Sequence, residues 1–365
     1  MNKYMGNISR RQFITAIDAM GAGAMLPSGA PFAQTPIAEA KSHRIDVHYH
    51  ILPSRYFANE RARGGLMFPL TDIGFSQARI QALIDRFAPA RAVEELDRNG
   101  IATAISSIIA GGVWFGDVPL GRRLAREWNE DATQLGRDHP GRFGVFATLP
   151  LPDTEGSLKE IEYALDTLKA DGIGLLTTYD DKWLGDPSFA PVFEELNRRK
   201  AVVFVHPTAP LCCRALNTGT PAFFLEVPTD TARTIASLIF TGTLRRFPDT
   251  RFIFSHAGGT IMAVAGRITG LAQDASAALA NIPNGMEAEL AKLYYDTAGA
   301  ADGAAIGALR SIVPTSHILF GSDYPFVPIP QTTVGLTKLG IAATDLQAIE
   351  RGNAQALFSR WQGKL

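Results

Sequence analysis

Short apolar segments and amphipathic segments alternate between residues 44 and 321, and this alternation constrains the fold more than any other feature. The apolar segments are rich in β-branched residues and have the length of strands. Strands that alternate with helical segments are typical of parallel βαβ units. The predicted strands are residues 44–50, 102–109, 143–149, 174–178, 201–206, 251–256, 293–297 and 317–321.

The segments between these strands have apolar residues at three- and four-residue spacing, which predicts helices. Examples are residues 120–137, 157–168, 189–199, 231–246 and 303–311. Eight strands separated by helices predict a closed (β/α)8 barrel, the TIM-barrel fold. A doubly wound open sheet is the alternative, but that fold commonly has a Gly-rich loop after its first strand. No such loop follows residues 44–50.

The barrel is expected to form one domain over residues 44–365. The chain has 365 residues, of which 46% are hydrophobic and 19% charged, so a sizeable core can be buried. Residues 51–89 interrupt the alternation with two adjacent glycines and several prolines and aromatic residues. Long connections of this kind are usually functional or mobile, and we expect this one to fold over the barrel mouth.

The N-terminal residues resemble an export signal rather than part of the fold. Residues 9–14 (SRRQFI) match the twin-arginine pattern, residues 16–25 are mostly apolar around Asp18, and residues 30–33 are small enough for a cleavage site. We therefore predict a twin-arginine (Tat) signal peptide over residues 1–33 and exclude it from the fold. The predicted location is the periplasm, with the cytoplasm as the alternative.

Composition excludes several classes of partner. The formal net charge is −1, and a nucleic-acid partner would require a basic face, so we expect none. No apolar run reaches the roughly 18 residues that a membrane helix requires. The two cysteines, Cys212 and Cys213, are adjacent, so neither a disulfide framework nor a cysteine metal site is expected.

The positions of the histidines point to a metal site. Four of the seven histidines end predicted strands, and an aspartate follows the eighth strand; these residues are His48, His50, His206, His256 and Asp323. Barrel enzymes build their chemistry from the carboxyl ends of strands. Residues two apart on a strand face the same side, so His48 and His50 can reach one ion, and Asp46 lies on that side too.

Imidazole and carboxylate groups suit zinc, and also manganese or iron. His206 and Asp323 would complete the set from across the barrel, which leaves an open position for a substrate. His43 and His317 begin predicted strands and His139 ends a helix, so we interpret these three as structural.

Four motifs resemble the amidohydrolase-related decarboxylases. They are residues 45–53 (IDVHYHILP), 205–207 (VHP), 254–259 (FSHAGG) and 321–325 (GSDYP), and the resemblance extends over residues 44–358. This family includes the decarboxylases of α-amino-β-carboxymuconate-ε-semialdehyde, γ-resorcylate and 5-carboxyvanillate. The subgroup that the chain resembles most is similar to bacterial 6-methylsalicylate decarboxylase.

The resemblance implies that one divalent metal, zinc first and manganese second, is held by His48, His50, His206 and Asp323. It implies that His256 is an acid/base residue beside the metal. Asp323 is expected to take part in the same proton transfer. It also places Arg79 and Arg267 where relatives bind the substrate carboxylate. In relatives an arginine like Arg267 can come from a neighbouring subunit, so a homodimer or higher homo-oligomer is expected.

The predicted activity is nonoxidative decarboxylation of a small aromatic, salicylate-type acid or a related unsaturated acid. Trp114 and Phe115 follow the second strand, where they could stack on an aromatic ring or pack under a lid. A metal-dependent hydrolase of a lactone or amide, a hydratase, and a non-catalytic binding barrel are the alternatives. The two-metal hydrolases of the superfamily that the chain resembles usually carry a lysine on the fourth strand. Residues 174–179 contain no lysine, so the resemblance disfavours a two-metal hydrolase.

Overall fold

The computed structural model describes residues 43–53, 55–56, 74–109, 111–208, 210, 213, 219–271 and 280–362. The predicted signal peptide, residues 1–33, lies outside the described residues, so export stays a prediction. Residues 57–73 of the predicted barrel-mouth segment also lie outside them. The described end of that segment is helical from Gln77, whereas its sequence indicated an irregular connection.

Eight parallel strands form the barrel, in the order β1-β2-β3-β4-β7-β8-β9-β10. The sheet closes between its two ends, because Val47 N donates to the Phe320 carbonyl at 2.9 Å and Asp323 N donates to the His48 carbonyl at 2.7 Å. The (β/α)8 prediction is confirmed. The barrel strands are β1 (Arg44–His50), β2 (Ile101–Ser107), β3 (Phe143–Thr148), β4 (Gly172–Leu176), β7 (Val202–His206), β8 (Arg251–Phe254), β9 (Tyr294–Asp296) and β10 (Ile318–Leu319).

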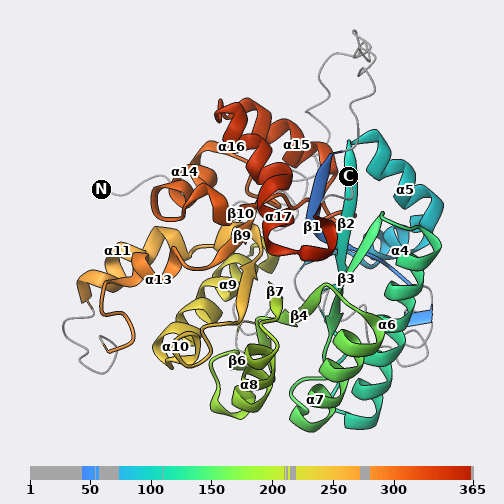
Figure 1. Ribbon diagram of the computed structural model, residues 1–365, viewed down its shortest axis with the longest axis horizontal. Helices are drawn as coiled ribbons and strands as arrows, with labels where there is room; N and C mark the ends of the chain where they lie inside the picture. The colour runs from blue at the N-terminus through green and yellow to red at the C-terminus, as the bar shows by residue number, and fades with distance from the viewer. Residues whose placement is uncertain are drawn as a thin grey trace, which may run out of the picture. The chain divides into compact units, whose positions relative to one another are not determined.

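Helices surround these strands, and the chain passes around the barrel in sequence order (Figure 1). A short hairpin of β5 (Thr178–Tyr179) and β6 (Lys182–Trp183) follows β4. Among the described helices, none is both long and apolar enough to span a membrane. The α-helices are α4 (Gln77–Arg86), α5 (Pro89–Arg98), α6 (Val118–Asp138), α7 (Thr154–Glu162), α8 (Ala190–Arg198), α9 (Ala222–Phe240), α10 (Thr243–Arg246), α11 (Ile261–Leu271), α13 (Met286–Leu290), α14 (Gly303–Ile312), α15 (Ile329–Lys338), α16 (Ala343–Gln347) and α17 (Asn353–Leu357).

Several boundaries differ by a few residues from the sequence prediction, and two of these differences have a clear physical reason. Helix α9 begins at Ala222, whereas the sequence predicted a start at residue 231; the helix contains Pro228, and proline usually indicates a helix boundary. Strand β8 ends at Phe254 rather than at His256, because His256 has a left-handed backbone with φ of 55°. His256 therefore belongs to the turn after the strand.

One end of the barrel interior is filled by the C-terminal segment. Apolar side chains from β1, β2, β3, β7, β8 and β10 form one buried cluster with residues from α17 and the turn after it. Phe358 and Trp361 are 4% and 2% exposed there, and fully burying such a side chain contributes roughly 1.5–3 kcal/mol. This packing closes the barrel at the amino ends of the strands. The barrel interior is therefore accessible from the carboxyl ends of the strands.

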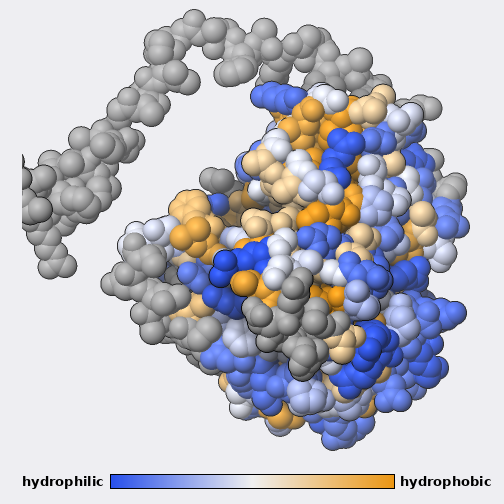
Figure 2. All heavy atoms as spheres, turned by 90° about the vertical axis from the view of Figure 1, so that its left-hand side faces the viewer, coloured by the Kyte–Doolittle hydropathy of each residue, from blue (hydrophilic) through white to orange (hydrophobic). Residues whose placement is uncertain are grey.

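The outer surface is mixed. On the face shown in Figure 2, hydrophobic residues form patches between hydrophilic ones. The large apolar side chains that are most exposed include Phe224, Leu225 and Leu271, at 60%, 55% and 52%. Phe224 and Leu225 lie in the first turn of α9, which borders the site described next.

Candidate active site

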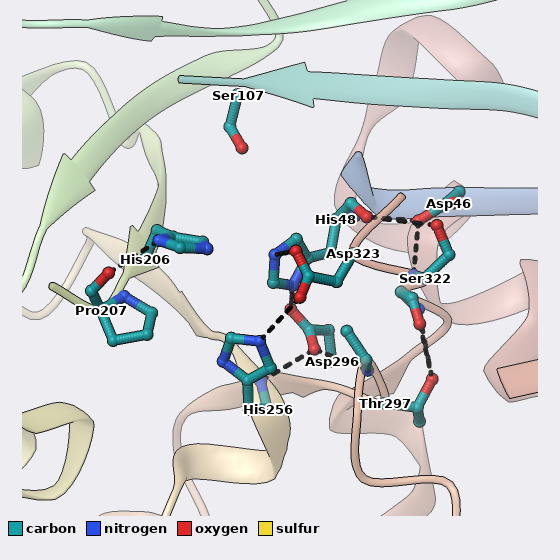
Figure 3. Close-up of polar contacts among 12 residues, drawn as sticks. Asp46, His48, Ser107, His206, Pro207, His256, Asp296, Thr297, Ser322 and Asp323 are labelled. Atoms are coloured by element: carbon teal, nitrogen blue, oxygen red, sulfur yellow. Dashed lines mark hydrogen bonds and ion pairs between the residues drawn. The ribbon is translucent and has the colours of Figure 1, made fainter. Parts of the chain in front are cut away.

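Two histidines of β1 and the aspartate that follows β10 meet at the carboxyl end of the barrel. Figure 3 shows one of these histidines, His48, beside Asp323. The Nε2 atoms of His48 and His50 are 3.2 Å apart. Asp323 Oδ1 lies 3.3 Å from His48 Nε2 and 3.2 Å from His50 Nε2. Both histidines are fully buried. Alternation along β1 therefore turns both rings to one point, as the spacing predicts.

His206 and His256 complete the cluster from β7 and from the turn after β8. The His206 ring lies 5.1 Å from that of His48 and 4.8 Å from that of His50, measured between centroids. His256 Nε2 lies 3.5 Å from Asp323 Oδ2. One nitrogen or oxygen from each of His48, His206, His256 and Asp323 falls within 4.8 Å of all the others. The structure thus brings together all five residues of the predicted metal and catalytic set.

The surrounding protein orients three of the rings. In each, Nδ1 lies within hydrogen-bond distance of a protein oxygen, which leaves Nε2 for the cluster. The pairs are His48 with Asp296 Oδ2 at 2.8 Å, His50 with the Ser107 carbonyl at 3.2 Å, and His206 with the Pro207 carbonyl at 2.8 Å. Neutral imidazole with Nδ1 protonated is the form that offers Nε2 to an ion.

Asp296 is a site residue that the sequence analysis missed. It ends β9, and its side chain is fully buried against His48. The signal was present, because Asp296 ends a predicted strand just as the four histidines do. The same rule about strand ends would have selected it.

The backbone at the site is strained. His256, Ala257 and Asp323 have φ of 55°, 54° and 63°, in the left-handed region that non-glycine residues rarely adopt. Such conformations cost roughly 1–3 kcal/mol each and gather at functional sites. Gly321 lies beside them, and a Cβ at this position would come within 2.9 Å of the Cβ atoms of His48 and Asp296. Only glycine fits where these elements meet.

The electrostatics of the cluster suit a cation. Burial holds the pKa of His206 well below its usual value. Burial alone would raise the pKa of Asp323, but His48 and the neighbouring histidines outweigh it and hold that pKa well below its usual range. Burial by itself would lower the pKa of His48, but the nearby carboxylates of Asp296 and Asp323 outweigh burial and raise this pKa to about 10. The surroundings of His48 therefore favour a positive charge at this point of the cluster.

The donor set therefore fits a divalent metal. Ligand bonds of about 2.0–2.2 Å in a tetrahedral site place neighbouring donor atoms roughly 3.3–3.6 Å apart. The separations among His48 Nε2, His50 Nε2 and Asp323 Oδ1 are 3.2–3.3 Å. Histidine and aspartate become ligands in their deprotonated forms. Of the two further histidines, His206 is 9% exposed and His256 has a side chain that is 20% exposed.

A cavity of about 420 Å³ opens beside this cluster and is lined by His206, His256 and Asp323. The rest of its wall comes from helices and loops. That wall is mainly apolar, with Arg79 and Gln331 as its polar side chains among the described residues. The apolar part includes Phe75, Phe223, Phe224, Val227, Pro228, Phe326 and Val327.

Arg79 lies on this wall, whereas the other predicted substrate residues lie elsewhere. Its guanidinium stands 4.5 Å over the Phe75 ring and donates to the Phe326 carbonyl at 3.1 Å. Arg267 is exposed on α11, outside the described cavity lining, and its predicted role across a subunit boundary stays a prediction. Trp114 and Phe115 are half-buried and also outside that lining.

A parallel barrel with histidines and an aspartate at its carboxyl end defines an amidohydrolase-type scaffold. The comparisons make this assignment specific, because residues 45–360 match the Amidohydrolase family. The chain is 35% identical over 341 residues to the decarboxylase macB of Penicillium terrestre, covering 88% of this chain and 96% of the relative. It is 32% identical over 333 residues to the 6-methylsalicylic acid decarboxylase of Penicillium expansum, covering 88% and 98%. The chain belongs to the amidohydrolase family, as its motifs predicted.

Solved structures share the fold. A dihydroxybenzoic acid decarboxylase from Polaromonas, with manganese and the inhibitor 2-nitroresorcinol bound, superposes with a TM-score of 0.74. The alignment covers 87% of this chain and 97% of that one, at 21% identity. At this identity the likeness establishes the barrel, and the activity is argued from the site.

Proposed function

We propose that this protein is a divalent-metal-dependent decarboxylase of a small aromatic carboxylic acid. The observation that carries the proposal is the meeting of His48, His50 and Asp323 within 3.3 Å, with His206 alongside, next to an apolar cavity. The curated relatives named above are decarboxylases, which supports the reaction type.

His48, His50, His206 and Asp323 are the residues that we assign to the metal. His50 is preferred to His256 because it is fully buried and its Nε2 approaches both His48 and Asp323. Three imidazoles and one carboxylate suit zinc first and manganese second. When bound, the metal would take up the carboxylate and an ortho hydroxyl oxygen of the substrate and fix the ring in one pose.

His256 supplies the proton. Decarboxylation of an aromatic carboxylate requires a proton on the ring carbon that bears the carboxylate. The carbon–carbon bond then breaks, carbon dioxide leaves, and the bonding electrons restore aromaticity, so one proton is consumed. His256 lines the cavity, and its 20% exposed side chain can be reprotonated from solvent. Asp323 Oδ2, at 3.5 Å from His256 Nε2, stabilises the protonated ring.

The cavity wall suits a flat and mostly apolar ring. Phe326 lies edge-on to His50 with 5.5 Å between ring centroids, and Phe75 lies edge-on to Phe326 at 5.6 Å. Offset and edge-to-face contacts of this kind favour an aromatic guest. Arg79 adds one positive charge to this wall for an acidic group. A methyl-bearing salicylate such as 6-methylsalicylic acid is the first substrate to test.

The test uses the purified full chain with its metal content measured. The protein would be supplied with Zn²⁺ or Mn²⁺ and mixed with salicylic, 6-methylsalicylic and 2,6-dihydroxybenzoic acids, and with a panel of lactones. Release of carbon dioxide and of the matching phenol supports the proposal. Hydrolysis of a lactone without carbon dioxide release from any acid would establish a hydrolase instead. Metal-loaded protein that releases no carbon dioxide from a broad panel of acids would overturn the proposal.

A further inference from the structure

The carboxylate of Asp296 contacts both His48 and His256. Its Oδ2 faces His48 Nδ1 at 2.8 Å. Its Oδ1 accepts the backbone N–H of His256 at 3.0 Å and that of Ala298 at 2.9 Å. One buried side chain thus contacts both a residue of the metal set and the backbone of the acid/base residue (Figure 3).

The first contact sets which nitrogen of His48 is available. A carboxylate only accepts hydrogen bonds, so Asp296 requires the proton of a neutral His48 ring to lie on Nδ1. His48 Nε2 then has its lone pair directed at His50 and Asp323, the two groups it approaches within 3.3 Å. Carboxylate partners of ligating histidines also fix the ring orientation and make the ligand more basic.

The second contact holds a strained turn. His256 has φ of 55°, and the conformation persists only if the surrounding structure enforces it. The hydrogen bond from His256 N to Asp296 Oδ1 anchors the residue at this point. Gly321 then allows the segment after β10 to pass against Asp296 and His48, because a Cβ there would come within 2.9 Å of both side chains.

We propose that Asp296 is a positioning residue that fixes the His48 tautomer and, through the backbone, the place of His256. The inference rests on the proposed function, because it concerns the same metal and acid/base groups. It adds a residue that couples them and that is not itself among the cavity-lining residues described above.

The substitution Asp296→Asn separates the two roles. The amide oxygen can keep both backbone hydrogen bonds, and the amide NH₂ then faces His48 Nδ1 and donates to it. The His48 proton moves to Nε2, where it blocks metal binding. We expect the affinity for Mn²⁺ and for Zn²⁺, measured by chelator competition, to fall about 10- to 100-fold while the protein stays folded.

Asp296→Ala removes both roles. It leaves the N–H groups of His256 and Ala298 without their acceptor, so kcat at saturating metal should fall below that of Asp296→Asn. The absorption spectrum of the cobalt-loaded protein gives a second readout, because it reports ligand geometry without any turnover. A changed spectrum in Asp296→Asn is expected.

Glu350→Gln is a matched control, because Glu350 lies in the helical turn Ala348–Gly352 and contacts the start of the same strand, β1. Glu350 pairs with His43 Nε2 at 2.8 Å and with Arg44 Nε at 2.7 Å, at the opposite end of β1. This substitution breaks a similar carboxylate–histidine pair away from the cluster, so metal affinity should match wild type.

The outcomes separate this inference from the proposed function. Wild-type affinity and cobalt spectrum in Asp296→Asn would overturn the positioning role even if the wild type decarboxylates its substrate. Weaker metal binding in Asp296→Asn, with no decarboxylation by the wild type, would support the positioning role and overturn the function. If metal affinity falls equally in Asp296→Asn and Glu350→Gln, Asp296 contributes only to general stability and has no positioning role.

Discussion

The metal cluster and the cavity wall beside it are built in different ways. The cluster residues come from strand ends or the turns directly after them, and three of the rings have a hydrogen-bond partner on the side away from the cluster. The wall comes from helices and loops, and its side chains include Phe224, which is 60% exposed. In barrel enzymes the rigid strands hold the reacting groups, and the surrounding helices and loops determine which substrate binds. Substitutions in the cluster should therefore abolish chemistry, and those in the wall should change substrate preference.

Removing one ligand should have the largest effect. His206→Ala deletes the imidazole that β7 contributes, and three donors remain of the proposed four. We expect metal content to fall from about one ion per chain to near zero, and turnover to become undetectable. Elemental analysis after dialysis measures the loss. His139→Ala, at the end of α6, is the control and should retain metal. Full metal content in His206→Ala would remove His206 from the ligand set.

Replacing the acid/base residue should separate metal binding from chemistry. His256→Asn retains a polar side chain but cannot transfer a proton, so kcat should fall about 10²- to 10⁴-fold. Metal content should remain that of the wild type, because His256 is not among the four assigned ligands. If the metal is lost together with activity, His256 is a ligand, which the close approach of its ring nitrogen to Asp323 Oδ2 would allow.

On the wall, the positive charge of Arg79 should affect substrate binding more than chemistry. A hydrogen bond to a charged group contributes about 1.5–3 kcal/mol, so Arg79→Ala should lower kcat/KM roughly 10- to 100-fold, mainly through KM. The metal content should not change. Arg91→Ala, an exposed arginine on α5, is the matched control. A loss confined to kcat would show that Arg79 acts on the reacting bond instead.

Asp230 links helix α9, which contributes to the cavity wall, to the loop after the cluster residue His206. The protonation of Asp230 should change the free energy of unfolding with pH. It lies on α9, is fully buried, and accepts hydrogen bonds from the Thr177 hydroxyl and from Trp183 Nε1. The Thr177 hydroxyl in turn accepts Thr208 N, in the loop after His206. Burial raises the pKa of Asp230 from 3.8 to about 6, and its hydrogen bonds offset this only in part.

A raised carboxyl pKa means that the folded protein binds the proton more tightly than the unfolded chain. The stabilisation from this proton is complete below pH 3.8 and is lost as pH rises through 6. Asp230→Asn lacks this loss, so its free energy of unfolding relative to wild type should rise by up to about 3 kcal/mol from pH 4 to pH 7. Urea unfolding at four pH values measures the difference, with Asp138→Asn as an exposed control. If the difference in the free energy of unfolding between Asp230→Asn and wild type does not vary with pH, the raised pKa of Asp230 is contradicted.

The cluster could be predicted from sequence, whereas Arg79 was the one wall residue that the sequence indicated, and this difference has a physical reason. His48, His50, His206 and His256 were found because a strand end is a local feature, visible in a few residues. The wall depends on where α4 and α9 begin, and Pro228 concealed the start of α9. Phe75 and Phe223, whose rings lie 5.2 Å apart, are far apart in sequence and carry no pattern that links them. Asp296 lay within reach of the strand-end rule and was missed.

Trp114 lies outside the described cavity lining, and its substitution should have the smallest effect. The sequence allowed it to stack on a substrate ring, whereas its Nε1 donates to Asp180 Oδ2 at 2.8 Å, outside the described cavity lining. Trp114→Phe retains an aromatic ring and removes this hydrogen bond. The free energy of unfolding should therefore fall by about 0.5–1.5 kcal/mol.

The same substitution should change kcat/KM less than twofold, because no described wall residue depends on the Trp114 indole. Thermal unfolding and initial rates on one substrate measure both quantities. A loss of tenfold or more in kcat/KM, with stability unchanged, would place Trp114 against the substrate. The wall would then extend to the loop after β2, and the aromatic surface facing the metal cluster would have two sides rather than one.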